Sequence, residues 1–243
     1  MNKHIFRSIM LFFLVAAFSA CVKDNYDGPN AQFTGAIRDS LDGALVEQDL
    51  QNGSTLEVVE LGYESQVSQF WLIKNSGEFT NNLVFANKYD VYLRNGNFFP
   101  YSVPALEIKP GMNQHDFAVV PYIRVKNCNI TYDKVANTIK ASFNLEPGKS
   151  SVKLKQIRLY AFSDIYVGAY VTFNPSGGSD RQAFSPSASI DPQQTYSLTI
   201  DLNTNGSIFK TGRDYFFRVG ALADVSGVGT IRTNYAPNKM ITL

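Results

Sequence analysis

The sequence predicts an all-β protein built from two tandem β-sandwiches. Apolar and polar residues alternate along most of the chain, and clusters of Gly, Asn, Pro and Ser interrupt that alternation at short intervals. No stretch after the leader has the period of a long amphipathic helix. With 44% hydrophobic, 13% aromatic and 18% charged residues, the chain of 243 residues has the composition of a globular protein, which excludes a disordered or coiled-coil one.

Residues 1–20 follow the plan of a secretory signal peptide. Lys3 and Arg7 supply the positive start, and the apolar run over residues 9–18 is too short to span a membrane. Residues 18–21, Phe-Ser-Ala-Cys, then place a cysteine directly after two small residues. This segment resembles a bacterial lipobox, which implies that Cys21 is the lipidated first residue, carrying acyl chains such as palmitate. An ordinary signal peptide with an incidental cysteine is the alternative.

Residues 21–31 are predicted to form a flexible leash, because they are polar and contain a Gly-Pro pair. Lys23, Asp24 and Asp27, just behind Cys21, resemble the acidic export tag of surface lipoproteins in the Bacteroidota. The resemblance implies a protein held on the outer membrane by its lipid anchor and facing outside. A solvated linker has a similar charge pattern.

Residues 32–121 are predicted to form the first sandwich, with turns at Asn52-Gly53 and Asn95-Gly96. Its expected strands are Phe33–Arg38, Thr55–Glu60, Gln69–Lys74, Leu83–Phe85, Tyr89–Arg94 and Asp116–Val120. The segments Gly77-Glu78-Phe79 and Tyr89-Asp90-Val91 resemble the closing pieces of a transthyretin-like or carboxypeptidase-regulatory-like sandwich. Trp71 shares a strand face with Ile73 and is expected in this core.

Residues 122–243 are predicted to form a second sandwich, which begins after the seam at Pro121. Its six or seven expected strands are Tyr122–Tyr132, Thr138–Leu145, Val152–Phe162, Val167–Phe173, Thr195–Leu202 and Tyr215–Ala221, with Ile241–Leu243 as the closing edge. The number and spacing of these strands are typical of an immunoglobulin- or fibronectin-III-like sandwich.

The order of lipobox, acidic leash and two sandwiches resembles a Bacteroidota lipoprotein family of unknown activity, the domain-of-unknown-function family 3823. The resemblance covers nearly the full chain and implies an association with starch-utilisation-type glycan uptake systems. The implied partners are a polysaccharide or oligosaccharide, an outer-membrane transporter and its companion lipoprotein. No catalytic residue and no cofactor comes with the resemblance.

Charge and catalytic residue types argue against nucleic-acid binding and against an enzyme. Lys plus Arg is 22 and Asp plus Glu is 21, and removal of Lys3 and Arg7 leaves 20 against 21, so no basic surface for nucleic acid is expected. His115 is the only histidine after the leader, and no Gly-x-Ser-x-Gly elbow is present. A hydrolase would need acids such as Asp164, Asp191 and Asp214 to meet in space, whereas solvated loop positions explain them more simply.

Asp201–Gly206 matches the first half of a calcium loop, because oxygen ligands alternate there before a glycine. The twelfth position is Gly212 in place of a bidentate Glu, and an Asn-Gly turn explains the same residues, so no metal is predicted. Cys128 is the only cysteine besides Cys21, so we expect a buried thiol and no disulfide.

Aromatic residues provide the candidate ligand-binding site, because flat rings stack on the apolar face of a pyranose. Val167–Phe173 is predicted to place Tyr166 and Tyr170 on an outer face, where Arg158 and Tyr160 of the neighbouring strand join them. A half-covered sheet whose tyrosines pack on a loop is the competing interpretation. Phe98, Phe99 and Tyr101 follow a turn without strand alternation, so they are predicted to line a groove or the seam between domains.

The predicted function is that of a non-catalytic cell-surface lipoprotein that binds or presents glycan for an outer-membrane uptake system. A structural lipoprotein that docks on the transporter without contacting sugar is the main alternative. A calcium-stabilised adhesin and a hydrolase with a spatially assembled acid pair are two further ones.

Overall fold

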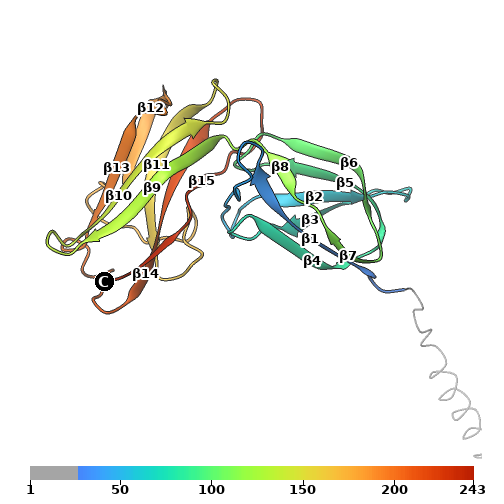
Figure 1. Cartoon of the computed structure of the whole chain (residues 1–243), viewed down its shortest axis with the longest axis horizontal. Coiled ribbons are helices and arrows are strands. Elements are labelled where there is room, and N and C mark those ends of the chain that lie inside the picture. The colour runs from blue at the N-terminus through green and yellow to red at the C-terminus, as the bar shows by residue number, and fades with distance from the viewer. Residues whose placement is uncertain (1–26) are drawn as a thin grey trace, which may run out of the picture.

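The computed structural model describes residues 27–243, which form two β-sandwiches placed end to end (Figure 1). The predicted leader and Cys21 lie outside these residues. Within the described part all regular structure is strand, which confirms the predicted all-β class and the tandem sandwiches. No helix long and apolar enough to cross a membrane occurs within residues 27–243.

Two sheets form the first domain. In one sheet the central strand β1 pairs with β4 and, in parallel, with β7 and β8; in the other the order is β3-β2-β5-β6. The strands are β1 (Ala31–Asp39), β2 (Thr55–Glu60), β3 (Ser68–Leu72), β4 (Glu78–Val84), β5 (Asn87–Arg94), β6 (Tyr101–Ile108), β7 (Gly111–Gln114) and β8 (Phe117–Val119). β1 begins at Ala31, so the last residue of the predicted leash belongs to the sheet.

Alternating apolar residues of both sheets fill the first core. Phe33, Phe79 and Phe117 pack against one another, with Phe33 also in edge contact with Trp71. Trp71 is 9% exposed, which confirms its predicted place in the core. Asn52 and Asn95 adopt φ values of 55° and 56°, the left-handed conformation that an Asn-Gly turn uses.

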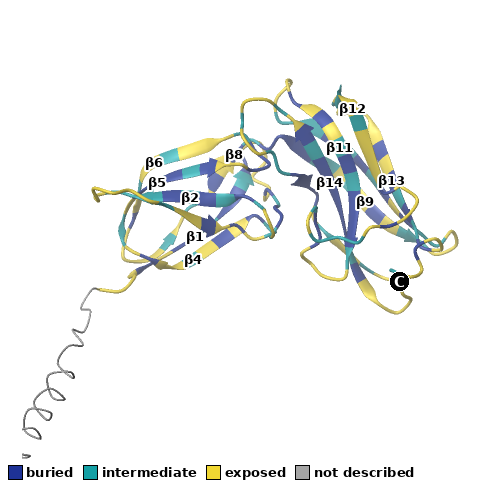
Figure 2. Ribbon diagram, turned by 180° about the vertical axis from the view of Figure 1, so that it is seen from behind, coloured by how far each residue is buried: buried dark blue, intermediate teal, exposed yellow. Residues whose placement is uncertain are grey.

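The second domain also has two sheets, ordered β13-β10-β9 and β12-β11-β14, with β15 and β16 both pairing β14. The strands are β9 (Ile123–Asp133), β10 (Thr138–Pro147), β11 (Lys153–Phe162), β12 (Arg181–Ser189), β13 (Thr195–Asp201), β14 (Asp214–Asp224), β15 (Asn234–Tyr235) and β16 (Lys239–Thr242). Ile139, Ala141, Phe143 and Leu145 are at most 1% exposed, as their alternation predicts. Figure 2 shows the buried residues gathered between the sheets of each domain.

The predicted strand Val167–Phe173 is wrong. Residues 163–180 form an irregular connection that covers the outer side of β11 at Val167 and then returns along the edge of that strand, where the N–H of Phe173 donates to the carbonyl of Ala161 at 2.8 Å. Val167 is fully buried there against Tyr160 and Tyr235. Val167 therefore covers the outer side of the sheet, whereas Phe173 packs against the core between the two sheets.

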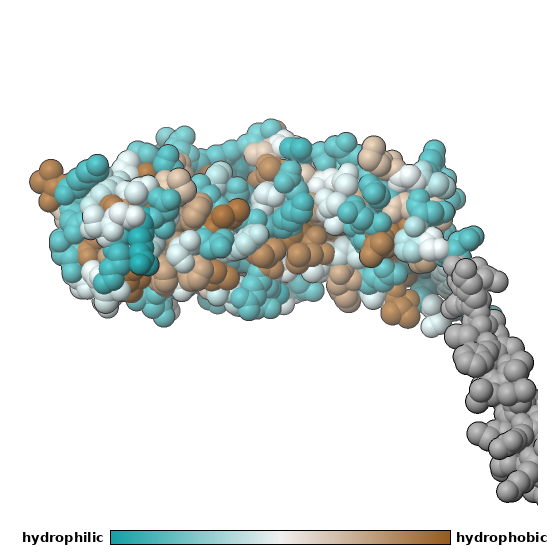
Figure 3. All heavy atoms as spheres, turned by 90° about the horizontal axis from the view of Figure 1, so that it is seen from below, coloured by the Kyte–Doolittle hydropathy of each residue, from teal (hydrophilic) through white to brown (hydrophobic). Residues whose placement is uncertain are grey.

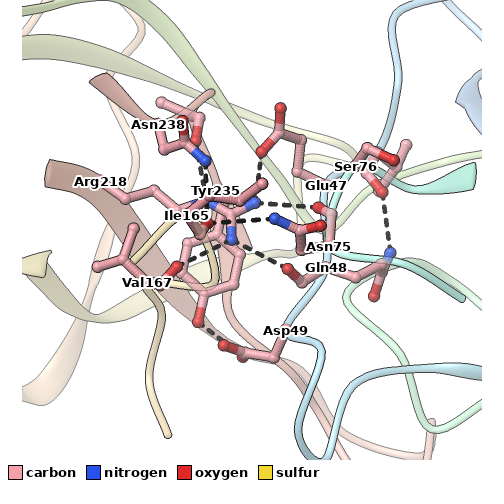
Figure 4. A network of polar contacts seen from close by, with 12 residues as sticks. Glu47, Gln48, Asp49, Asn75, Ser76, Ile165, Val167, Arg218, Tyr235 and Asn238 are labelled. Atoms are coloured by element: carbon pink, nitrogen blue, oxygen red, sulfur yellow. Dashed lines mark hydrogen bonds and ion pairs between the residues drawn. The ribbon is translucent and has the colours of Figure 1, made fainter. Parts of the chain in front are cut away.

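A buried polar network joins the two domains (Figure 4). The Arg218 side chain is fully buried and donates to the carbonyls of Gln48 at 3.0 Å, Asn75 at 3.3 Å, Val167 at 3.2 Å and Ala236 at 3.2 Å. It also pairs with the Glu47 carboxylate. Gln48, Asn75 and Glu47 belong to the first domain, so one side chain of β14 holds both domains.

Further contacts fix the domains relative to each other. Asn97 of the first domain donates to the carbonyl of Thr233 at 3.1 Å, and Asn234 donates to the carbonyl of Asn97 at 2.7 Å. The Arg124 guanidinium, 8% exposed, binds both oxygens of Asp39. Together with the Arg218 network, these contacts hold the two domains against each other.

Candidate functional site

The second domain has a pocket of about 340 Å³ on the outer side of its β12-β11-β14 sheet. β11 and β14 form its floor, and the 163–180 connection and residues 231–233 form its walls. The lining residues are Gln156, Arg158, Tyr160, Ala169, Tyr170, Gly220, Leu222, Ile231, Arg232 and Thr233. We call this depression the tyrosine pocket.

Tyr170 provides the exposed aromatic ring of the tyrosine pocket. Its side chain is 51% exposed, and its hydroxyl accepts a hydrogen bond from Nη1 of Arg232 at 3.2 Å. The contact joins two walls of the pocket and orients the ring. A phenol held by its hydroxyl can still present one apolar face to a ligand.

Tyr160 lies beneath the pocket and is only 6% exposed. It makes an edge contact with Tyr235 at a centroid distance of 5.9 Å, and burial raises its pKa to about 12. Gly220 makes room for this packing, since a Cβ atom there would lie 2.7 Å from the Tyr160 ring and 2.7 Å from Thr233. Tyr160 therefore forms part of the pocket floor and offers no free ring face for stacking. This agrees with the competing interpretation, in which tyrosines of the sheet face pack beneath a loop.

Arg158 borders the pocket with its charge already paired. Its Nε lies 3.3 Å from Asp180, its Nη2 donates to Oδ1 of Asn174 at 3.0 Å, and its guanidinium carbon is 5.1 Å from the Tyr160 centroid. Asp180 is buried, so this ion pair fixes the guanidinium at the pocket edge.

The other predicted ligand residues do not line the tyrosine pocket. Tyr166, 42% exposed, lies on the same connection as Tyr170. Phe98 is 1% exposed in the first core, so its predicted role in binding is corrected to a packing role. Phe99 packs edge-on against Tyr122 at 4.9 Å beneath the Lys149 ammonium, which places it at the seam. Tyr101 is 41% exposed on β6 of the first domain.

Arg232, Gln156 and Thr233 are pocket residues that the sequence did not reveal. Arg232 lies in a polar segment between β14 and β15, where no alternation marks an inward or outward face. Only the fold brings this segment back across β14. The isolated positive charge after Gly227 and Gly229 is the one sequence signal that could have suggested it.

The acids considered for hydrolysis do not come together as a set of three. Asp191 follows β12, whose Ser189 pairs with Lys153 at the start of β11, whereas Asp164 follows the end of β11. These positions are separated by a ten-residue strand, a distance of about 30 Å. His115 packs edge-on against Phe117 at 4.7 Å, and its neighbour Asp116 binds Arg38.

Asp201–Gly206 adopts a turn that uses its own carboxylate. The Asp201 side chain accepts hydrogen bonds from the Asn203 N–H at 2.8 Å and from the Thr204 hydroxyl at 2.9 Å. No group of three or more His, Cys, Asp or Glu side chains within residues 27–243 is arranged to hold a metal ion. Cys128 is half-buried, and burial raises the pKa of its thiol to about 11.

Another cavity, of about 290 Å³, lies at the domain junction. Its charged lining residues bind each other, since Arg124 pairs with Asp39 and Lys126 with Asp42. These pairs connect the domains, so a ligand in this cavity would compete with contacts that hold the junction together. The tyrosine pocket is therefore the better candidate site.

Comparison with known proteins places the chain in one family. Residues 31–120 match the family described as "Protein of unknown function (DUF3823) N-terminal domain", and residues 123–238 match "Domain of unknown function (DUF3823_C)". No curated protein matches the chain.

Solved structures agree with this assignment. The crystal structure of a "putative carbohydrate binding protein" from Bacteroides uniformis is 49% identical, with a TM-score of 0.85 over 89% of this chain and 100% of that one. A DUF3823 family protein from Parabacteroides merdae has a TM-score of 0.69 at 20% identity over 89% and 100% of the two chains. Another from Bacteroides ovatus has a TM-score of 0.68 at 16% identity over 87% and 98%. With both of its domains matched, this chain belongs to the DUF3823 family.

Proposed function

We propose that this protein is a non-catalytic glycan-binding protein and that the tyrosine pocket is its binding site. The observation that carries the proposal is the exposed Tyr170 ring, held over a pocket whose other walls supply polar groups. The Bacteroides uniformis relative, which shares nearly half of its residues with this chain, is named for carbohydrate binding and supports the proposal.

The chemistry of the pocket suits a sugar ring. A pyranose has an apolar face formed by C–H groups and a rim of hydroxyls. Tyr170 offers a flat apolar surface for that face, while Gln156, Thr233 and Arg232 offer hydrogen-bonding groups for the hydroxyls. A concave site with one aromatic wall and a few polar groups is a typical small-ligand site.

We further propose that the protein is anchored through Cys21 to the outer membrane, facing outside, beside a glycan transporter and its companion lipoprotein. The described part of the chain begins at the end of the first domain that is remote from the second (Figure 1). β1 then runs nine residues, about 30 Å, toward the domain junction. A lipid at Cys21 would therefore leave the tyrosine pocket on the distal domain. The Cys21→Ala variant should lose membrane association in detergent partitioning, and retention in an alkaline-washed membrane would contradict the anchor.

Affinity electrophoresis of residues 27–243 against a panel of polysaccharides tests the binding function. A polysaccharide that binds should retard the wild type, and Tyr170→Ala should weaken binding by about 1–3 kcal/mol if the ring stacks on sugar. Tyr63→Ala is the matched control, because Tyr63 is 60% exposed in the first domain and lies outside the pocket. If Tyr170→Ala is retarded as strongly as the wild type, the binding site lies elsewhere, and Tyr166 and Tyr101 become the next candidates for substitution.

A docking role without sugar contact is the second candidate. Leu83 and Met112, 76% and 88% exposed, lie on strands that flank the start of β1. On the face shown in Figure 3, however, the hydrophobic residues form several separate clusters with hydrophilic residues between them. That surface favours glycan binding as the main function. If no polysaccharide retards the protein, docking becomes the leading role.

A further inference from the structure

A second depression, of about 330 Å³, lies on the first domain beside the tyrosine pocket. Its lining residues come from β2, β3 and β5, from residues 50–53 and the Asn95 turn, and from the second domain: Leu50, Asn52, Gly53, Thr55, Phe70, Leu72, Arg94, Asn95 and Arg232. Arg232 lines both depressions, so they meet at this side chain.

Three hydrogen bonds fix Arg232 at the meeting point. Its backbone N–H donates to the carbonyl of Gly96 at 2.9 Å, and its Nε donates to the carbonyl of Asn95 at 3.4 Å. Nη1 donates to the Tyr170 hydroxyl at 3.2 Å. The Thr230 N–H adds a contact to Oδ1 of Asn95 at 3.1 Å. The guanidinium is therefore held between the two domains before any ligand arrives.

The charged residues that line the two depressions are all arginines. Arg94, Arg158 and Arg232 line them, and no Asp or Glu does. Arg94 is paired with Glu57 at 3.1 Å and Arg158 with Asp180 at 3.3 Å, whereas Arg232 makes no ion pair within residues 27–243. Asp49 is close enough for Arg232 to lower its pKa, but its oxygens accept from the Tyr235 hydroxyl and the Ala169 N–H.

The first-domain depression also offers an apolar surface. Phe70 and Leu72 are 65% and 55% exposed and lie on the same face of the edge strand β3. Large exposed apolar side chains beside a cation resemble the arrangement of Tyr170 beside the same cation in the second domain. Each side of Arg232 thus has one surface on which a sugar ring can pack.

We propose that the two depressions form one continuous site for an acidic oligosaccharide. A carboxylate or sulfate of the ligand binds the Arg232 guanidinium, and the sugars on either side pack on Tyr170 and on Phe70 with Leu72. This inference rests on the proposed glycan-binding function and adds to it the charge class of the ligand and the participation of the first domain. A planar guanidinium with free N–H donors is suited to both anions.

Calorimetric titration of residues 27–243 with matched charged and neutral oligosaccharides tests the proposal. Hexagalacturonate is compared with its fully methyl-esterified form, and a sulfated dextran oligosaccharide with unmodified dextran of the same length. At least one acidic probe should bind about tenfold or more tightly than its neutral partner. Comparing the affinities for hexagalacturonate and for the sulfated dextran shows whether a carboxylate or a sulfate is preferred. Neutral probes that bind as tightly as the acidic ones would overturn the charge class.

Substitutions test the role of Arg232 and of the first domain. Arg232→Gln should remove the preference for the acidic probe, while Arg232→Lys, which keeps the charge, should retain most of it. Phe70→Ala should weaken binding of the hexasaccharide by about tenfold and binding of a disaccharide much less, because only the longer ligand reaches the first domain. Thermal unfolding of each variant verifies that the fold is kept.

The outcomes separate this inference from the proposed function. Binding that depends on Tyr170 but is unchanged by Arg232→Gln and Phe70→Ala would leave the tyrosine pocket as the whole site and overturn the two-domain site. If no acidic or neutral probe binds, including those of the larger polysaccharide panel, both the two-domain site and the proposed glycan-binding function are wrong.

Discussion

Replacing Arg218 should uncouple the two domains. The Arg218→Met substitution keeps an unbranched apolar side chain of moderate length but removes the guanidinium, which is fully buried. The carbonyls of Gln48, Asn75 and Val167 then lose their donor, and the Glu47 carboxylate loses its cation. Removal of one partner of a buried ion pair costs about 3–5 kcal/mol, because it leaves the other charge uncompensated.

Urea unfolding followed by two probes measures this loss. Trp71 is the only tryptophan and lies in the first core, so its fluorescence reports that domain, while far-UV circular dichroism reports both. In the wild type the two transitions should coincide. With a slope of about 2 kcal/mol per M, the loss in Arg218→Met lowers the midpoint by about 1.5–2.5 M, and the two transitions should separate.

Glu47, the carboxylate partner of Arg218, provides a second variant for comparison. Glu47→Gln leaves Arg218 with its carbonyl partners, so it should cost less than Arg218→Met, and the double variant should recover part of the loss. An Arg218→Met protein within about 1 kcal/mol of the wild type, with coincident transitions, would show that the buried network does not join the domains.

Two more predictions concern the same interface. Gly168→Ala should destabilise the protein by about 1–3 kcal/mol, because the added Cβ would lie 2.1 Å from Oδ1 of Asp49; Gly206→Ala, whose nearest contact is 3.7 Å, is the control, and equal melting temperatures of the two variants would contradict the steric argument. Burial raises the pKa of Asp49 in the folded state, so its carboxyl favours folding when protonated and this contribution is lost as pH rises through the folded pKa. The melting temperature of the wild type relative to Asp49→Asn should therefore fall between about pH 3 and about pH 8, and a rise would show that Tyr235 and Ala169 stabilise the anion more than burial opposes it.

The central strands could be predicted from the sequence because burial gives them a pattern. Ile157, Leu159 and Ala161 face the core and alternate with the outward-facing Arg158, Tyr160 and Phe162 on β11, which is paired on both sides. The sequence missed four strands, β6, β7, β12 and the two-residue β15. The first three lie at sheet edges and most of their side chains are exposed, whereas β15 is buried but too short to show a pattern. An edge strand is held by backbone hydrogen bonds, which leave no periodic mark in the sequence.

The candidate site was predicted only in part, for a related reason. Alternation correctly placed Arg158 and Tyr160 on the outer side of β11, and it suggested Tyr170 from a strand that does not exist. Arg232 reaches the pocket through a loop that turns back to the first domain, a tertiary contact with no local signal. Arg218 did leave one signal, a charge between Phe217 and Val219 in an otherwise apolar strand, which indicates a buried partner.

The chain passes between the domains once, at Pro121, and several contacts cross the junction: Asn97 binds Thr233 beside that crossing, Arg218 binds Gln48, and Tyr235 binds Asp49. Bending of one domain against the other would have to break several of these contacts, among them the buried hydrogen bonds of Arg218 and the Tyr235–Asp49 contact. A force that acts on one domain is therefore passed on to the other and is not absorbed by bending between them. A small-angle scattering profile of the intact chain should accordingly fit a single elongated shape and remain unchanged when ligand binds.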